Sequence, residues 1–132
     1  MRHEHTFNMD EYADDDGRTA PITWAGSFQR AMWTSFFGLI DEELRPVEQN
    51  IHFPTTDALP SYSSMIDDLG GVDVVYGGLG WGGHIAFWEP QRGFELEGDL
   101  AAYRQAGART VELHPRTVRL IALPALRVGG SA

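Results

Sequence analysis

The feature that most constrains the fold is an apolar stretch that runs directly into a glycine-rich one. Residues 72–78 read VDVVYGG, which is β-branched, apolar and bounded by glycines, and this pattern predicts a buried strand. Four glycines then fall within residues 78–83. Each glycine weakens a helix or strand by about 1 kcal/mol relative to alanine, so these residues are expected to form a loop. The sequence therefore predicts a strand that ends in a glycine loop.

Strands and helices are expected to alternate along the rest of the chain. Apolar residues recur at helical spacing in residues 23–44, with Thr23 as a possible N-cap and Pro46 as the stop. The tail, residues 116–132, is ambiguous because Pro124 interrupts its apolar run. The other expected elements are strands at 3–9, 50–53 and 108–114, helices at 57–71 and 99–107, and loops at 10–21 and 91–99. This alternation predicts an α/β fold with a mostly parallel sheet covered by helices on both faces.

Length and composition predict one compact domain over residues 1–132. The chain is 42% hydrophobic, which is enough for one core and not for two. It has no apolar run near the ~20 residues that span a membrane, and its first residues show no secretory signal. It has no cysteine, which excludes disulfides, thiolate nucleophiles and cysteine-ligated zinc. A cytoplasmic protein that does not bind membranes is expected.

The charged residues exclude further classes of function. All ten basic side chains are arginine, so neither a Schiff-base lysine nor a Walker A lysine is possible. A net charge of −9 argues against a nucleic-acid partner, because phosphate contacts need clustered cations. Five of the arginines fall within residues 101–132. They are interpreted as a solvated face, with an anion site as the alternative.

Acidic and imidazole side chains follow two of the predicted strands. Asp10 and Glu11 come just after the first strand, and His84 and Glu89 follow the strand at 72–78. Ligands of open α/β sheets bind beyond the carboxyl ends of the strands, so Asp10 and His84 are expected to share one pocket there. Three carboxylates and an imidazole are typical proton-transfer groups. The alternatives are loop acids or a helix cap for the first pair, a structural histidine, and a surface glutamate.

Two further patterns, a pair of histidines and a group of large apolar residues, are not interpreted as functional sites. His3 and His5 would share one face of a strand, as two metal ligands do, but no third ligand accompanies them at a convincing spacing, so no metal site is expected. The aromatic residues and methionine of 23–44 are interpreted as core. They are too many for one side of a lone helix, so an exposed apolar patch and self-association are also expected. The large apolar residues concerned are Trp24, Met32, Phe36 and Phe37.

Two separated motifs resemble one enzyme family. The sequence TFNMDEY at residues 6–12, followed by a strand and by GGLGWGGHIAFWEP at residues 77–90, resembles the glucosamine-6-phosphate deaminase/isomerase family. In that family the corresponding motifs read NMDEY and GGxGxDGHIAFNEP. The resemblance covers residues 5–119, and related glycine loops occur in 6-phosphogluconolactonases of the same superfamily. It implies a three-layer, mostly parallel Rossmann-like sheet with helices on both faces, present here as an incomplete domain.

The resemblance also implies a reaction and a role for each residue. The family converts an amino-sugar phosphate into a ketose phosphate and ammonia, without metal or cofactor, and a homo-oligomer is expected. Asp10 matches the residue that moves a proton between C2 and C1. His84 matches the residue that assists ring opening, and Glu89 matches the carboxylate that orients this imidazole. The remaining substrate contacts would come from Glu11, Gly78, Gly80, Gly82 and Gly83.

Departures from the family pattern predict impaired activity. The family's aspartate two places before the histidine is Gly82 here, its asparagine is Trp88, and Trp81 is added to the loop. Family members are about twice as long and carry a Gly-Ser/Thr phosphate loop upstream of the MDEY motif. The chain is therefore interpreted as a fragment that turns over substrate poorly by itself. The alternatives are a non-catalytic remnant that binds a sugar phosphate or another subunit, and a lactonase-like hydrolase in which His84 activates water.

Overall fold

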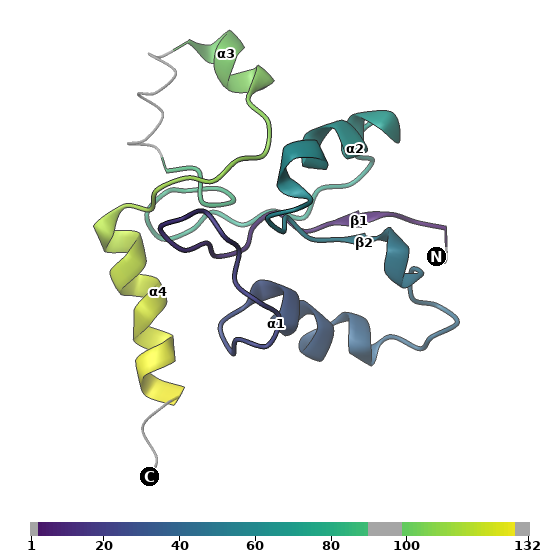
Figure 1. Cartoon of the computed structure of the whole chain (residues 1–132), viewed down its shortest axis with the longest axis horizontal. Coiled ribbons are helices and arrows are strands. Elements are labelled where there is room, and N and C mark those ends of the chain that lie inside the picture. Colours follow the sequence, from purple (N-terminus) through teal and green to yellow (C-terminus); the bar gives the residue numbers. More distant parts are fainter. Residues whose placement is uncertain (1–2, 90–98, 129–132) are drawn as a thin grey trace. The chain divides into compact units, whose positions relative to one another are not determined.

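The chain divides into two compact units, Met1–Gly70 and Gly71–Ala132, and each is described by itself. The structure is a computed structural model that describes residues 3–89 and 99–128 (Figure 1). No helix in the described ranges is both long enough and apolar enough to cross a membrane. The expectation of one domain over the whole chain stays a prediction.

The first unit is built on a pair of short parallel strands. Strand β1 (Thr6–Phe7) pairs with β2 (Ile51–His52), and the register places Thr6 against Ile51 and Phe7 against His52. The two strands are joined by a crossover that contains helix α1 (Phe28–Ser35), as parallel pairing requires. Both strands were expected from the sequence, and both are shorter than their predicted ranges. The α/β class and the parallel pairing are therefore confirmed.

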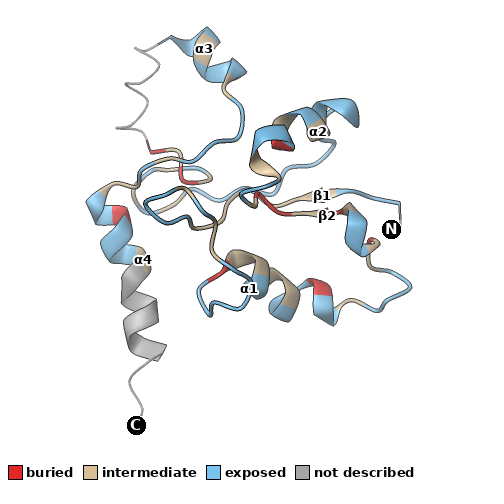
Figure 2. Cartoon of the chain, in the orientation of Figure 1, coloured by how far each residue is buried: buried red, intermediate tan, exposed pale blue. Residues whose placement is uncertain are grey.

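Helical segments pack against both faces of this strand pair. On one face Ile51 is buried with Phe37 and Phe53, and the rings of these two phenylalanines meet edge to face at 6.4 Å. On the other face the ring of Tyr62, at the start of helix α2 (Tyr62–Asp68), meets the edge of Phe7 at 5.5 Å. Figure 2 shows in red that buried residues of this unit lie at β2, at the start of α2 and along the segment that contains α1. The residues that pack partly buried against the first face are Met32, Trp33 and Ile40.

Helix α1 is shorter than predicted, and the expected N-cap is wrong. Its N-cap is Ser27, whereas Trp24 belongs to a turn in which its backbone N–H donates to the carbonyl of Pro21 at 2.9 Å. The helix stops at Phe36, whose φ of −136° is not helical, and the 3-10 helix η1 (Phe37–Leu39) follows. The chain turns there because residue 38 is glycine, and a β-carbon at Gly38 would overlap the carbonyl oxygen of Trp33.

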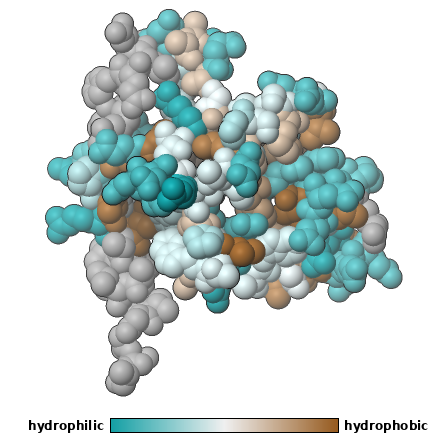
Figure 3. Space-filling view, in the orientation of Figure 1, coloured by the Kyte–Doolittle hydropathy of each residue, from teal (hydrophilic) through white to brown (hydrophobic). Residues whose placement is uncertain are grey.

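The apolar residues of 23–44 divide between the core and the surface. Phe37 is fully buried, whereas Trp24 and Phe36 are about half exposed, at 50% and 52%. Apolar residues reach the visible face in Figure 3 as brown patches. Single apolar side chains of this region are thus exposed, and both the apolar patch and self-association through it stay predictions.

The second half of the first unit follows the sequence more closely. The 3-10 helices η2 (Glu48–Asn50) and η3 (Leu59–Ser61) precede β2 and α2. Helix α2 ends before Gly70 and Gly71, which have φ of 90° and 100°, values that favour glycine. The predicted helical end at these glycines is confirmed.

The second unit contains helices and irregular backbone. Helix α3 (Leu100–Gln105) begins at Asp99, whose carboxylate accepts hydrogen bonds from Ala101 N and Ala102 N at 2.8 and 3.1 Å. The ambiguous tail forms helix α4 (Pro115–Val128), which contains Pro124. The predicted helix at 99–107 is confirmed. The predicted loop at 91–99 lies almost wholly outside the described residues.

Two predicted strands are absent from the described part of the second unit. Residues 72–78 and 108–114 form no strand, and β1–β2 is the only sheet in the described ranges. Val74 and Val75 are 63% and 68% exposed. A strand needs a neighbour for its backbone N–H and C=O groups, and residues 72–78 have none here. The three-layer sheet is therefore seen only as one strand pair with helical segments on its two faces.

Removing the hydroxyl of Tyr62 should destabilise the first unit. This buried hydroxyl donates to the carbonyls of Asn8 at 2.8 Å and His52 at 3.1 Å, and so ties α2 to the ends of both strands. We expect Tyr62→Phe to lower the free energy of unfolding by about 1–3 kcal/mol, because the carbonyls of Asn8 and His52 each lose a hydrogen bond from this hydroxyl. Tyr76→Phe, at an 89% exposed position, is the matched control in urea unfolding. Equal losses in both variants would contradict this role.

The same hydroxyl should make stability fall at alkaline pH. Burial raises the pKa of Tyr62, so above the usual tyrosine pKa of about 10 the folded chain keeps a proton that the unfolded chain releases. The stabilisation is therefore complete below about pH 10 and is lost as the pH rises further. Urea unfolding at about pH 8 and pH 11 should show a smaller loss in Tyr62→Phe than in the parent chain. A loss of the same size in both would rule this out.

Candidate functional site

The predicted site residues lie in two segments that belong to different units. Asp10 and Glu11 follow β1 in the first unit, and His84 and Glu89 lie on the glycine loop of the second unit. Each segment has a defined internal geometry. The common pocket expected for Asp10 and His84 stays a prediction.

The carboxylate of Glu11 caps helix α1 from outside the helix. One oxygen accepts from Phe28 N at 3.0 Å, and the other accepts from Gln29 N at 2.9 Å and from Ser27 Oγ at 2.8 Å. Ser27, fully buried, accepts in turn from Arg30 N at 3.2 Å. Three backbone N–H groups that the helix itself cannot satisfy are thus paired, and the carboxylate lies at the positive end of the helix dipole. The sequence left open whether Glu11 is a loop acid or a helix cap, and the structure shows a helix cap. The predicted contact of Glu11 with substrate stays a prediction.

Asp10 is half-buried beside this cap. It lies between the end of β1 and the tethered Glu11, so the backbone on both sides of it is held. Burial is the main cause that raises the pKa of Tyr12, and the negative charges of Asp10 and Glu11 add to it. Tyr12 also stacks on Phe28 at 4.9 Å between ring centroids. The segment after β1 is therefore an acidic corner that is fixed against the start of α1.

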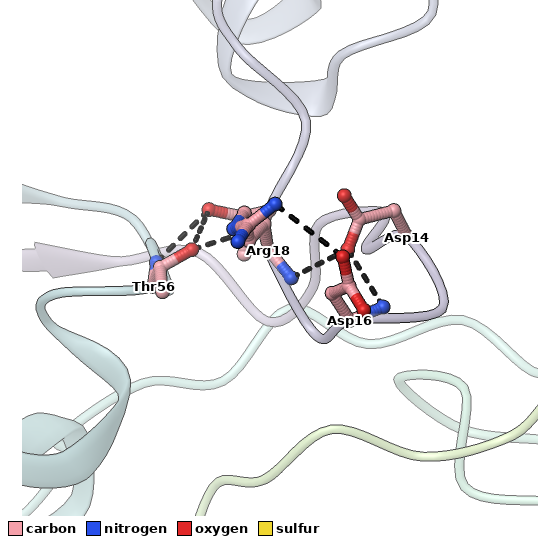
Figure 4. A network of polar contacts seen from close by, with 5 residues as sticks. Asp14, Asp16, Arg18 and Thr56 are labelled. Carbon is pink, nitrogen blue, oxygen red and sulfur yellow. Dashed lines mark hydrogen bonds and ion pairs between the residues drawn. The ribbon is translucent and has the colours of Figure 1, made fainter.

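The loop after Tyr12 closes on itself and on the segment after β2 (Figure 4). The carboxylate of Asp14 accepts from Asp16 N at 3.0 Å and from Arg18 N at 2.8 Å. Thr19 and Thr56 exchange hydrogen bonds, each backbone N–H donating to the hydroxyl of the other at 2.8 and 2.9 Å. The predicted loop at 10–21 is confirmed, and it is closed by contacts that its sequence alone does not reveal.

In the second unit, His84 and Glu89 face each other in a buried position. His84 Nδ1 lies 3.9 Å from Glu89 Oε2, and the side chain of Glu89 is 1% exposed. Neither of these two atoms has a hydrogen-bond partner among the described residues. At 3.9 Å the predicted hydrogen bond between them is not formed, although the carboxylate lies next to the ring. Glu89 is therefore buried against the imidazole and is not a surface acid.

A tight turn brings these two residues together. Ala86 and Phe87 both have positive φ, 50° and 60°, and Ile85 and Trp88 exchange backbone hydrogen bonds at 3.3 and 2.8 Å. This is the geometry of a type I′ turn, which reverses the chain. Non-glycine residues at positive φ store strain, and such strain concentrates at functional positions. This turn folds the chain back between His84 and Glu89, which are five residues apart in the sequence.

The glycines of the loop have different roles. A β-carbon at Gly80 would overlap the ring of His84, so the ring packs directly on the glycine backbone. A β-carbon at Gly78 would meet nothing within 4 Å. Gly83 has a φ of 83°, which favours glycine. At Gly82 a β-carbon would lie 3.6 Å from His84 Nδ1 and 3.7 Å from Glu89 Oε2.

Helix α4 and the residue before it supply two contacts of this region that the sequence did not indicate. The backbone N–H of His114, just before α4, donates to the other oxygen of Glu89 at 3.3 Å. Thr117, in the first turn of α4, is 2% exposed, and its hydroxyl would lie 3.2 Å from a β-carbon at Gly82. Nothing in the local sequence distinguishes Thr117, because its burial depends on how α4 packs against the glycine loop.

The two tryptophans that depart from the family pattern have different environments. Trp88 lies under the guanidinium of Arg109, at 4.6 Å, and meets the ring of Tyr103 edge to face at 5.3 Å. Trp81 is 91% exposed. Trp88 therefore contributes to packing in the second unit, and Trp81 leaves a large apolar surface on the loop. No group of three or more metal-ligating side chains exists among the described residues.

The chain is similar to curated proteins that are named glucosamine-6-phosphate deaminase. The relative from Phocaeicola vulgatus is 36% identical over 91 residues, which cover 64% of this chain and 31% of the relative. The relative from Parabacteroides distasonis is 39% identical over 89 residues, and that from Drosophila pseudoobscura is 37% identical over 91 residues. Each of these two alignments covers 64% of this chain and 30% of the relative. The resemblance to that family is confirmed, and the partial coverage is consistent with a partial member of it.

The chain thus spans about 30% of the length of the curated relatives it matches. No family model matches it, and no solved structure matches it.

Replacing Glu11 should weaken the start of α1. Glu11→Gln keeps one acceptor oxygen, but it removes the charge and turns an NH2 group toward donors that need an acceptor. We expect a loss of about 1–3 kcal/mol in the free energy of unfolding, measured by urea titration. Glu43→Gln, at an exposed position, removes the same charge as a control. The cap would be unimportant if the two variants lost the same amount.

A methyl group at Gly80 should displace the ring of His84, whereas one at Gly78 should not. Neither glycine has a positive φ, so the two alanine variants differ only in what the added carbon meets. In Gly80→Ala we expect new chemical shifts for the ring protons of His84 and a loss of about 1–3 kcal/mol from overpacking. In Gly78→Ala the ring signals should stay in place. Unchanged ring signals in Gly80→Ala would show that His84 does not pack on this glycine.

Proposed function

We propose that the chain belongs to a sugar-phosphate deaminase/isomerase that converts an amino-sugar phosphate to a ketose phosphate and ammonia, and that the 132-residue chain turns over substrate poorly by itself. The observation that carries the proposal is the buried Glu89 carboxylate beside the His84 ring, on a loop whose motif resembles that of the deaminases. The names of the curated relatives support the same reaction.

In the proposed reaction His84 assists opening of the sugar ring. An imidazole that moves a proton between the ring oxygen and the anomeric hydroxyl must present the correct nitrogen, and a carboxylate beside the other nitrogen selects it. Glu89 can do this because one of its oxygens accepts from His114 N, which leaves the other facing His84 Nδ1. Burial strengthens this effect, since water does not screen the carboxylate.

Asp10 is the proposed proton shuttle of the second step. Once the ring is open, a carboxylate close to C1 and C2 can take the proton from C2 and return it to C1. The proton shift leaves an imine at C2; water then adds to C2, ammonia leaves, and the oxygen of this water becomes the carbonyl oxygen of the ketose phosphate. The tether of Glu11 to α1 supports this role, because it holds the backbone next to Asp10 in one position.

The fold proposed for the longer protein is the three-layer, Rossmann-like sheet. The parallel pair β1–β2 supports it, since helical segments pack on its two faces. A homo-oligomer is proposed on the ground of exposed apolar surface, to which Trp24 and Phe36 contribute.

Position 82 supports the proposed loss of activity. The family's motif has an aspartate there, and here the position faces His84 Nδ1, Glu89 Oε2 and the hydroxyl of Thr117 without offering a side chain. Ring opening therefore lacks one carboxylate. Residue 82 does not have a positive φ, so the backbone can accept an aspartate.

A non-catalytic binding module is the second candidate. The observation that favours it is the 3.9 Å gap between His84 and Glu89, whose facing atoms are unpaired among the described residues. A catalytic pair is normally held by a hydrogen bond. Such a module would bind a sugar phosphate without converting it.

We predict no detectable release of ammonia from glucosamine 6-phosphate by the isolated chain. Positioned acid–base groups each contribute about 10²–10⁴-fold, and weak anchoring of the phosphate adds to the loss. Gly82→Asp alone should not restore turnover, because it supplies the carboxylate and not the anchor. Ammonia and fructose 6-phosphate are measured for both chains, with the Bacteroides fragilis deaminase as the positive control.

The outcomes separate the two candidates. Turnover by the parent chain that is lost in His84→Gln would overturn the predicted impairment and support the enzyme. Binding of glucosamine 6-phosphate in calorimetry, without turnover in either chain, would support the binding module. Turnover that survives in both His84→Gln and Asp10→Asn would contradict the assigned residues.

A further inference from the structure

One pair of ring nitrogens in the first unit has no part in the proposed reaction. His5 Nδ1 and His52 Nε2 share a hydrogen bond of 3.0 Å, and the two rings are nearly parallel with their centroids 5.3 Å apart. The strand register accounts for the pairing: Phe7 lies opposite His52, and His5 precedes Phe7 by two residues, so all three side chains share one face. Two residues that are 47 positions apart in sequence are thus brought into direct contact.

The separation of these nitrogens also falls in the range found for two ligands of one metal ion, which would replace the hydrogen bond between them. A transition metal binds imidazole nitrogen at about 2.0–2.1 Å, so two such ligands lie about 2.9 Å apart at a right angle and about 3.4 Å apart at the tetrahedral angle. The observed 3.0 Å falls within this range. We propose that His5 and His52 form a two-imidazole site for a late first-row divalent metal ion, which joins the start of β1 to β2.

One half of the proposed site is already fixed in place. The ring of His52 stacks on Phe7 at 4.4 Å between centroids. Its backbone carbonyl accepts from Asn8 N, from Asn8 Nδ2 and from the hydroxyl of Tyr62, at 3.0, 2.8 and 3.1 Å. The other ligand, His5, is exposed, so an ion reaches the pair from solvent. The His52 half of the site therefore loses little conformational freedom on binding.

The donor set defines the class of ion. Two neutral imidazoles suit Ni²⁺, Cu²⁺ and Zn²⁺, whereas Mg²⁺ and Ca²⁺ require oxygen ligands. No third histidine, aspartate or glutamate completes a group with this pair among the described residues, so water fills the remaining positions. The site is therefore open, and its affinity should follow the order Zn²⁺ < Cu²⁺ and Ni²⁺ < Cu²⁺.

Titration of the full chain with NiCl2 tests the site directly. Calorimetry should give one Ni²⁺ per chain, and the melting temperature should rise with NiCl2 concentration, because the ion binds the folded chain preferentially. MgCl2 at the same concentration should have no effect. His5→Gln should weaken Ni²⁺ binding by about tenfold or more, because one of two ligands is lost. With CuCl2, electron paramagnetic resonance should show coupling to two nitrogens in the parent and to one in His5→Gln.

His3→Gln is the matched control, since it removes an exposed histidine two residues from His5 and outside the pair. It should keep the parent's affinity within about twofold. Because His5 is exposed, His5→Gln is the primary test. It remains available if His52→Gln fails to fold. Equal binding by His5→Gln and the parent, an equal loss in His3→Gln, or no binding up to about 1 mM NiCl2 would overturn the proposal.

Discussion

The carboxylate of Glu11 is the contact on which the first unit depends. It satisfies the start of α1 and at the same time fixes the backbone that leaves β1, so one side chain joins a strand end to the helix of its crossover. A parallel pair of two-residue strands has too few backbone hydrogen bonds to hold itself together. Side-chain contacts from the flanking segments therefore carry the pairing: Glu11 from one side, and the hydroxyl of Tyr62 from the other.

Glu89 has a comparable position in the second unit. It accepts from the backbone just before α4 with one oxygen and faces the ring of His84 with the other. The strained turn at Ala86 and Phe87 and the close approach of Gly80 to the ring serve the same end, because both bring His84 against a buried carboxylate. Burying a carboxylate costs free energy unless nearby groups stabilise its charge. Such buried charged groups cluster at functional sites, which is the physical argument that His84 and Glu89 act as a pair.

The sequence indicated those elements whose signals are local. The glycines after α2, the capping aspartate of α3 and the β-branched residues of β1 and β2 act within a few positions, and their elements are present. The strand predicted at residues 72–78 is absent, because a strand depends on a neighbouring strand that the described part of the chain does not provide. Helix α1 starts later than predicted, at the N-cap Ser27, where the carboxylate of Glu11, 16 positions earlier in the sequence, completes the cap. Thr117 could not be found for the same reason: its burial is set by packing between distant segments.

The tautomer of His84 tests the central claim most directly, because the account depends on Glu89 acting on Nδ1. Nitrogen-15 spectra of the neutral ring at about pH 9 distinguish the two tautomers. The account predicts that Nδ1 carries the proton in the parent chain, and that Glu89→Leu shifts the proton to Nε2. A parent chain in which His84 already carries its proton on Nε2 would contradict it.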